Sequence, residues 1–490
     1  MKLSNETLGL LREKSQFSEQ VDLPKYDREK TKIGIVHLGL GAFHRSHQAY
    51  YTECALNQFG GDWGICGVSM RSTWLKESLD PQDCLYTIAK MDVTSEYQVI
   101  GALKEVLVAA KQVDQVLARM SHADTKVVTL TVTEKGYCLN SDGKIDLTHP
   151  GIQHDIATPS APQTAIGLLV ESLKTRQQNS IEAFTVIACD NLPENGSKLK
   201  AAVVQLAQQQ DQALADWIQS HVCFPSTMVD SITPKTEDSE IERISAVLTV
   251  QDDAPVQREM FTQWVIEDEI KGEVPAWDKV GVIFTNDVSA FEHTKLRILN
   301  GLHSTLAYMG RLAGYELVSQ AVADPKLKAF LLRMVANEVI PSIKPPQGLD
   351  LTQYSRDIIK RFENPKVAHQ LEQIACDGSI KIPVRILEPL QQNLSNGVEV
   401  KDYYLVVAAW IRFIWNKQQT SAQFNDPRAD ELLSLVAQFT GDAAQDIELF
   451  LSVPNLLPNA FADNQSFKQN LVAAYQAVIA AGDDFTSVLD

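Results

Sequence analysis

Three residues within a nine-residue stretch have side chains suited to proton-transfer chemistry. Lys295, Asn300 and His303 stand in Lys-Leu-Arg-Ile-Leu-Asn-Gly-Leu-His, which is otherwise rich in helix-forming apolar residues. At about 100° per residue of an α-helix, Asn300 and His303 lie roughly 140° and 80° around from Lys295, so all three share one side. A lysine that loses a proton, beside an amide and an imidazole that hydrogen-bond an alkoxide, suits the interconversion of a carbonyl and an alcohol. The alternative is a solvated lysine and a buried structural histidine.

The elements that would position these residues fall into two halves. In the first half, strand-like runs alternate with helical segments near 104–120 and 162–177, which predicts a mostly parallel, doubly wound α/β sheet. From about residue 286, segments with helical apolar periodicity replace the strand signals. We therefore predict a Rossmann-type domain over 1–285 and a mostly α-helical domain over 286–490, packed together with a cleft between them. The strand-like runs are Ile33–Leu38, Trp63–Met70, Tyr97–Gly101, Lys126–Thr133 and Phe184–Ala188.

Composition limits the class of partner. The 490 residues carry a formal charge of −18, which argues against nucleic acid or an anionic membrane as the main partner. The seven cysteines never form a Cys-x-x-Cys pair, which indicates buried free thiols in a reducing compartment. No apolar run resembles a signal peptide or a membrane span. We expect a cytoplasmic protein with a small-molecule substrate, as a monomer or small homo-oligomer.

The first strand-like run leads into a glycine turn and then a helix start. Glycines let the backbone approach a pyrophosphate, and a helix N-terminus offers free N–H groups to it. His44 replaces the third glycine of the usual Gly-x-Gly-x-x-Gly pattern, so the motif is incomplete. Its position at the first strand of an alternating pattern nevertheless favours a dinucleotide cofactor. The expected contacts are Gly39, Gly41, Ala42 and Phe43.

Two arginines bear on the choice of cofactor. Arg45 either adds charge near the phosphates or is an exposed helix residue. The end of the second strand, Ser69-Met70-Arg71-Ser72, lacks the carboxylate that would bind a ribose 2′-hydroxyl. Arg71 suits a 2′-phosphate instead, so this segment leaves NAD and NADP both open.

Polar loops follow two further strands, where ligands bind in a doubly wound sheet. Thr133 lies in the first loop and is an expected cofactor contact. Asn191 lies in the second, where its amide could donate to a carbonyl oxygen and accept from a hydroxyl. Asp230 is a candidate for the cleft wall. The alternatives are turn and capping chemistry for the loops and a surface carboxylate for Asp230.

Metal sites are not indicated by the histidine spacing. His44 and His47 have one-turn spacing, but no nearby cysteine or carboxylate completes a tetrahedral site. No zinc-protease, nucleophile-elbow or P-loop motif is present. We therefore expect no metal, with Lys295 handling the proton.

Six segments, in order, resemble the polyol-specific long-chain dehydrogenase/reductase family from about Ile33 past Phe461. They are HLGLGAFHRSHQ, LTVTEKGYC, ACDNLPENG, FPSTMVDSITP, QWVIED and KLRILNGLHS. The resemblance implies a Rossmann-type domain, a helical C-terminal domain, a nicotinamide cofactor (NAD, with NADP not excluded) and metal-free chemistry. It places the catalytic pattern K-x4-N-x2-H on Lys295, Asn300 and His303, and a substrate-side amide on Asn191. Neutral Lys295 would accept the hydroxyl proton, which requires a depressed pKa, while the three other side chains stabilise the oxygen.

The substrate branch rests on the segment from Gln373 to Arg385. Its QIA–DGS–K-x-P-x-R pattern resembles the uronate-reducing branch, whereas mannitol dehydrogenases tend to carry arginine at 373 and to lack it at 385. Lys381 is an expected substrate contact in either branch. Arg385 is either a carboxylate anchor or part of a structural ion pair. We predict interconversion of D-fructuronate and D-mannonate in hexuronate catabolism. Mannitol 2-dehydrogenase activity is the alternative, and a non-catalytic nucleotide-binding protein is a remote third reading.

Overall fold

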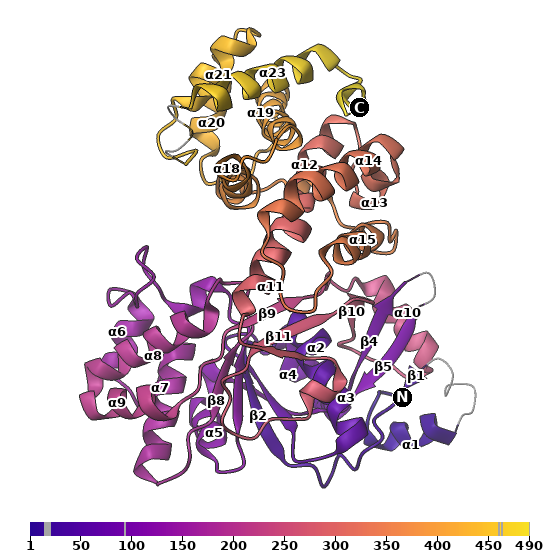
Figure 1. The fold of residues 1–490 in the computed structure, drawn as a ribbon. Helices are drawn as coiled ribbons and strands as arrows, with labels where there is room; N and C mark the ends of the chain where they lie inside the picture. The colour runs from indigo at the N-terminus through magenta and orange to yellow at the C-terminus, as the bar shows by residue number, and fades with distance from the viewer. Residues whose placement is uncertain (14–20, 93–94, 459–460, 462–463, 490) are drawn as a thin grey trace. The chain divides into compact units, whose positions relative to one another are not determined.

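The computed structural model describes residues 1–13, 21–92, 95–458, 461 and 464–489. The chain divides into two compact units, Met1–Ser289 and Ala290–Asp490. In the described residues, the first unit contains three sheets flanked by helices, and the second is helical (Figure 1).

The central sheet of the first unit has five parallel strands in the order β6-β3-β2-β7-β8. In sequence order, the first strand of this sheet is β2, near its centre. The next two strands, β3 and β6, lie on one side of β2, and the last two, β7 and β8, lie on its other side. The order therefore reverses between β2 and β7, which is the topological switch point where dinucleotides bind in such sheets. The strands are β2 (Ile33–Leu38), β3 (Gly64–Ser69), β6 (Leu103–Val108), β7 (Val127–Leu130) and β8 (Thr185–Ala188). The predicted doubly wound α/β class is confirmed.

Alternate side chains of this sheet enter two different cores. Val36 points toward the core shared with α5 (Ala109–Ser121), α7 (Ala165–Gln178) and α8 (Asn195–Gln210). Ile35 points toward the core shared with α3 (Gln48–Phe59). Because both faces are covered, the strands are almost continuously buried, as expected for a parallel sheet.

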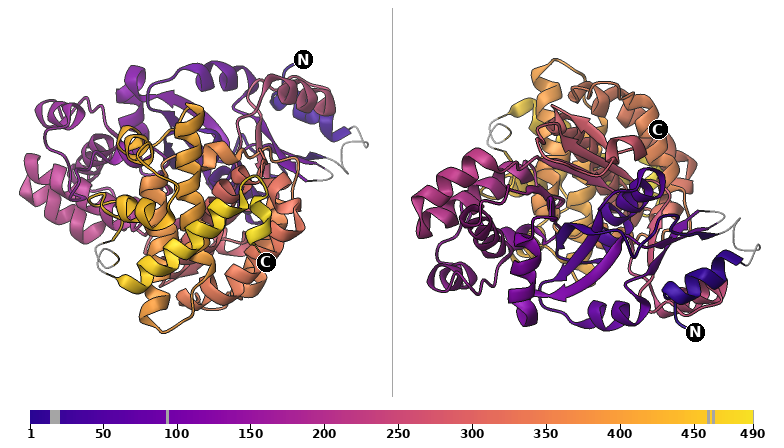
Figure 2. Two further views of the ribbon diagram at one scale, coloured as in Figure 1. Left: turned by 90° about the horizontal axis from the view of Figure 1, so that it is seen from above. Right: turned by 90° about the horizontal axis from the view of Figure 1, so that it is seen from below.

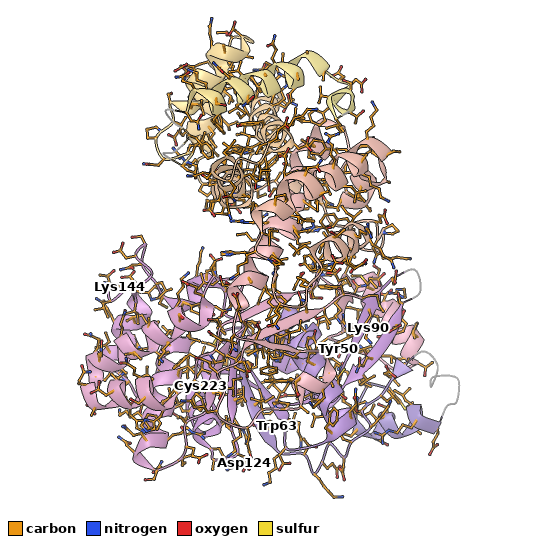
Figure 3. All side chains as sticks on the ribbon, in the orientation of Figure 1. Tyr50, Trp63, Lys90, Asp124, Lys144 and Cys223 are labelled. Atoms are coloured by element: carbon orange, nitrogen blue, oxygen red, sulfur yellow. The ribbon has the colours of Figure 1, made fainter. Side chains whose placement is uncertain are left out.

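Two smaller sheets complete the first unit. One has the order β1-β5-β4-β10 and the other β12-β11-β9. Lys90 of β4 and Arg258 of β10 both lie over the ring of Tyr50 from α3, at 5.2 and 4.3 Å from its centroid; Figure 3 labels Tyr50 and Lys90. The strands are β1 (Val21–Asp22), β4 (Tyr86–Met91), β5 (Glu96–Ile100), β9 (Thr227–Asp230), β10 (Val256–Glu259), β11 (Gln263–Glu267) and β12 (Ile283–Thr285).

The helix predicted over 104–120 is wrong at its start. Residues Leu103–Val108 form strand β6, and helix α5 begins only at Ala109. The apolar residues of β6 continue at helix-like spacing into α5, so periodicity alone does not show the break.

The second unit packs its helices around one core. Helix α19 (Asp402–Thr420) is buried along most of its length and contacts α12 (Gly301–Leu312) and α23 (Gln465–Ala481) (Figure 2). Helices α14 (Pro325–Met334) and α15 (Leu351–Phe362) add their apolar faces to the same core. Within the described part of the chain, no helix is both long and apolar enough to cross a membrane.

Three π-helical turns interrupt the helices in the described residues of this unit. They are η4 (Leu296–Asn300), η5 (Val335–Val339) and η7 (Pro383–Leu387), and η4 contacts both of the others. Turn η4 joins α11 (Val288–Lys295) to α12, so the regular α-helix predicted from Lys295 to His303 is wrong. A π turn bonds residue i to i+5, so Asn300 follows Lys295 by about one turn rather than lying 140° around from it.

Candidate active site

The turn after β2 can be built only with glycine at position 39. Gly39 has φ +93°, and a Cβ atom there would lie 2.1 Å from the carbonyl oxygen of Thr131. A Cβ atom at Gly41 would meet only the Gly39 oxygen, at 3.7 Å, so this side of the turn is open. Gly41 precedes α2 (Ala42–Ser46) and provides no side-chain cap. An open turn with uncapped amides beside the switch point fits a dinucleotide pyrophosphate.

A cavity of about 340 Å³ lies where β7 and β8 end. The structure brings Thr133 and Asn191 together in its wall, as two of the predicted contact residues. Thr133 adopts a left-handed φ of +65°, which is unusual for a residue with a branched Cβ. The lining residues are Thr133, Glu134, Lys135, Asp190 and Asn191.

Asp190 holds this wall in place. Its carboxylate accepts hydrogen bonds from the backbone N–H groups of Val132 (3.2 Å) and Thr133 (2.9 Å) and from the Tyr137 hydroxyl (3.0 Å). Burial raises the pKa of Asp190, although these three donors favour the charged form. This bracing role was not predicted. Its only sequence signal is a carboxylate placed directly after a buried strand.

The remaining predicted residues of the first unit have diverse surroundings. Arg45 is only 4% exposed, because its guanidinium lies 5.3 Å from the centre of the Tyr86 ring and donates to the Ala254 carbonyl. It is therefore not an exposed helix residue, and these contacts stabilise the core. Arg71 is exposed in the loop after β3, and Asp230 is buried at the end of β9.

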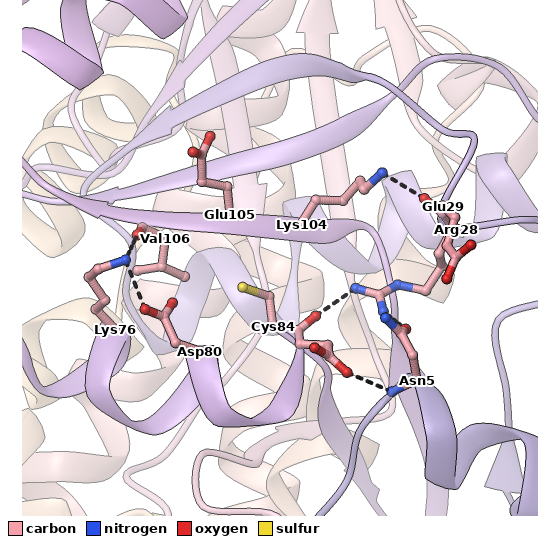
Figure 4. Close-up of a pocket in the computed structure, with 10 residues that line it drawn as sticks. Asn5, Arg28, Glu29, Lys76, Asp80, Cys84, Lys104, Glu105 and Val106 are labelled. Atoms are coloured by element: carbon pink, nitrogen blue, oxygen red, sulfur yellow. Dashed lines mark hydrogen bonds and ion pairs between the residues drawn. The ribbon is translucent and has the colours of Figure 1, made fainter.

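A second cavity of the first unit, about 360 Å³, is lined by charged side chains (Figure 4). Arg28, Lys76 and Lys104 each donate to a backbone carbonyl oxygen, at 2.8, 2.8 and 2.6 Å. Their charges thus hold loops and strand ends in place, which accounts for the polar lining of this cavity.

In the second unit, His303 is a neutral hydrogen-bonding group. Its ring stacks on Phe362 with centroids 4.4 Å apart and meets His369 edge-on at 5.0 Å. Burial is the main cause that holds its pKa well below the usual range, and the charges of His369 and neighbouring cations add to it. Its Nε2 is buried and has no hydrogen-bond partner among the described residues. A neutral imidazole with an unused nitrogen can bind a substrate oxygen.

Two predicted substrate contacts lie beside it. Arg385 donates to the Ser304 hydroxyl at 3.1 Å and to the Asn300 carbonyl at 3.5 Å. Lys381 donates to the Cys376 carbonyl at 2.7 Å and has Asp377 at 3.8 Å. Burial lowers the pKa of both cations. Over the described ranges no carboxylate pairs with Arg385, so the pattern of an ordinary structural ion pair is not found.

Three contributors to this region were not predicted from the sequence. Phe362 and His369 frame the His303 ring, and Ser304 receives Arg385. Phe362 had a weak signal as the last apolar residue of an amphipathic helix. The other two are recognisable only once the chain is folded.

Two family descriptions match the chain in sequence. The mannitol dehydrogenase Rossmann domain matches residues 33–279, and the mannitol dehydrogenase C-terminal domain matches residues 287–479. The chain belongs to the mannitol dehydrogenase family. This confirms the resemblance inferred from the six segments, and the protein is an oxidoreductase.

Individual relatives of this mannitol dehydrogenase family member cover almost its whole length. D-mannonate oxidoreductase of Escherichia coli (strain K12) is 40% identical over 469 residues, which are 94% of this chain and 96% of the relative. The Pseudomonas fluorescens mannitol 2-dehydrogenase, solved with NAD and D-mannitol, is 36% identical with a TM-score of 0.81, covering 99% and 98% of the two chains. A D-sorbitol dehydrogenase in substrate-free form is 30% identical with a TM-score of 0.90, covering 99% and 100%.

Proposed function

We propose that this family member interconverts D-fructuronate and D-mannonate with NAD as the preferred cofactor. One observation carries the choice of substrate. Lys381 and Arg385 place two positive charges next to His303, and Asp377, at 3.8 Å from Lys381, is the single acid paired with either of them over the described ranges. The similarity to D-mannonate oxidoreductase supports the same branch.

A carboxylate-bearing substrate would complete this cluster. A half-buried guanidinium without an acidic partner costs free energy, which a bound anion recovers through charge-assisted hydrogen bonds. Arg385 is held by Ser304 and still has unused N–H donors in its planar fork. A neutral ketose would bring no charge to this position.

The proton is handled by Lys295 in this proposal. In oxidation its neutral amine accepts the hydroxyl proton, and in reduction the ammonium returns it. The Asn300 amide donates a hydrogen bond to the substrate oxygen. His303, as a neutral imidazole with its hydrogen on Nε2, donates to the same oxygen, and both bonds stabilise the negative charge that develops there. A bound nicotinamide supplies or accepts the hydride.

The first unit would hold the cofactor. We assign the pyrophosphate to the turn and helix start at Gly39, Gly41, Ala42 and Phe43, with Thr133 and Asn191 as further contacts. Arg45 would contribute to the cofactor site only by stabilising the position of α2. Asp230 is assigned to the substrate.

The deciding experiment compares D-fructuronate and D-fructose as substrates for NADH oxidation by the purified protein, followed by NADPH with the better one. We expect a strong preference for fructuronate. A preference for fructose would move the protein to the mannitol 2-dehydrogenase branch, which its similarity to the Pseudomonas fluorescens enzyme favours. Binding of NADH without turnover of any polyol or uronate would instead indicate a nucleotide-binding protein.

A further inference from the structure

A hydrogen-bonded chain of side chains lies directly behind the glycine turn. His37 of β2 is fully buried, with Nδ1 2.7 Å from the Thr129 hydroxyl and Nε2 2.8 Å from the Thr131 hydroxyl. The Thr131 hydroxyl donates in turn to the carbonyl oxygen of Gly39 at 2.9 Å. The imidazole is thereby connected to the turn assigned to the cofactor.

The direction of this chain follows from counting protons. A threonine hydroxyl has one hydrogen, and Thr131 gives it to Gly39, so Thr131 accepts from Nε2–H of His37. Burial lowers the pKa of His37 to about 3, so the ring is neutral and carries one N–H. Nδ1 therefore accepts from the Thr129 hydroxyl. Each donor points the same way, from Thr129 through His37 and Thr131 to Gly39, and bonds aligned in this way reinforce one another.

The chain ends on a peptide group that is held from both sides. The Gly39 carbonyl and the Leu40 N–H belong to the same peptide, and Leu40 donates to the Val68 carbonyl at 3.0 Å. One edge of this peptide is thus tied to Thr131, the residue that follows β7, and the other to Val68 of β3. Glycine at φ +93° is permissive, so without these bonds the peptide could rotate and redirect the amides that follow it.

The helix after the turn rests on the same imidazole. The ring of His44 stacks on that of His37, with centroids 3.5 Å apart and an interplanar angle of 17°. Both nitrogens of His44 are buried without a partner among the described residues, so stacking is the contact that it contributes. His37 therefore contacts the turn on one side and the start of α2 on the other.

We propose that His37, acting through Thr131, is a positioning residue for cofactor binding. As the Nε2–H tautomer it fixes the Gly39–Leu40 peptide, and this sets the direction of the amides at Gly41 and Ala42. The inference rests on the proposed nicotinamide binding but not on the choice of sugar substrate.

The test measures NADH affinity by fluorescence titration in three variants. Thr131→Val removes the hydroxyl at nearly constant volume and should weaken NADH binding about five- to tenfold. Thr131→Ser keeps the hydroxyl and should stay within about twofold of the wild type, as should Thr129→Val, which leaves the bond to Gly39 intact. We expect kcat at saturating NADH to be retained in all three.

A packing role alone would give a different pattern. Thr131→Val would then lower Tm while its NADH affinity stayed at the wild-type value, and that result would overturn the proposal. If Thr131→Val does not fold, nitrogen NMR of the wild-type histidines provides the test. His37 should then be the neutral Nε2–H tautomer near neutral pH. An Nδ1–H tautomer or an imidazolium would contradict the proposed hydrogen-bond chain. If the variants show the expected NADH affinities but the protein does not reduce fructuronate, the proposed function is wrong and the inference about His37 still holds.

Discussion

The guanidinium of Arg385 donates to the hydroxyl of Ser304 at 3.1 Å, one residue after His303 in the chain. This bond joins π turn η7 to the first turn of α12, and the Asn300 carbonyl lies 3.5 Å from the same nitrogen. A substrate carboxylate bound by Arg385 would therefore be anchored to the backbone that carries the proposed oxygen-binding residues.

Replacing Arg385 by glutamine should raise KM for D-fructuronate by roughly ten- to a hundredfold, because charge-assisted hydrogen bonds are lost. KM for D-fructose should change by no more than about twofold, since that ketose has no carboxylate to bind. Steady-state kinetics with both substrates checks this. Arg356→Gln, on the exposed face of α15, is the matched control. Equal losses with both substrates, together with a lower Tm, would show that Arg385 only braces α12.

Lys295→Ala should lower kcat by a factor on the order of 10²–10⁴, the usual contribution of a positioned acid–base group. NADH affinity should be preserved, because the proposed cofactor contacts lie in other residues. Single-turnover kinetics with saturating NADH measures the effect, and Lys360→Ala, an exposed lysine of the same unit, serves as the control. Near-normal turnover by the alanine variant would remove Lys295 from the mechanism.

Arg71→Asp tests cofactor choice. The loop after β3 contains no carboxylate, and Arg71 is exposed in it. In such folds this loop binds the 2′-substituent of the ribose. We expect the ratio of kcat/KM for NADPH to that for NADH to fall about tenfold or more, because a 2′-phosphate would lose its cation and meet a like charge. The control is Lys111→Asp, an exposed charge reversal on α5. An unchanged ratio would place cofactor discrimination elsewhere.

Glu53 should make stability depend on pH in an unusual direction. It is fully buried and accepts from the N–H groups of Gly101 (2.8 Å) and Ala102 (2.7 Å) and from the Tyr26 hydroxyl (2.9 Å), and burial raises its pKa from 4.5 to about 7. Between these two values the folded state binds a proton that the unfolded state has released. The free energy of unfolding therefore falls as pH rises through this window, and levels off above it.

Denaturant unfolding of wild type and Glu53→Gln at several pH values measures this contribution. Because glutamine does not titrate, the wild type should lose stability relative to the variant by on the order of 1–3 kcal/mol across the window. A difference that is constant with pH would mean that Glu53 ionises normally in the folded protein.

The first half of the fold could be predicted where apolar runs end in clear breaks. Ile33–Leu38 is a strand with the predicted bounds because glycines end it at once, and Phe184–Ala188 differs from β8 by one residue. Strand β4 was missed because Tyr86–Met91 is buried on both faces and shows no alternation. The π turns also could not be predicted, since one extra residue per turn leaves the apolar composition unchanged.

The candidate site was predicted only as far as residue types along the chain allow. The spacing of Lys295, Asn300 and His303, and the amide Asn191 at a strand end, are visible in the sequence. The partners of His37 are not, because the pairing of β2 with β7 places Thr129 opposite it only in the folded sheet. Likewise Arg385 reaches Ser304 across 81 positions of sequence, which no local pattern shows.

The π turn at Leu296–Asn300 takes up one more residue than an α-helical turn would need. A single deletion within it would let ordinary α-helical bonding close, and the residues of α12 would keep nearly the same direction relative to Lys295, because four residues would then complete the turn that five complete here. An added residue would have no such turn to absorb it and would rotate every later residue of α12 by about 100°. Length variants of this segment should therefore tolerate the loss of one residue better than the gain of one.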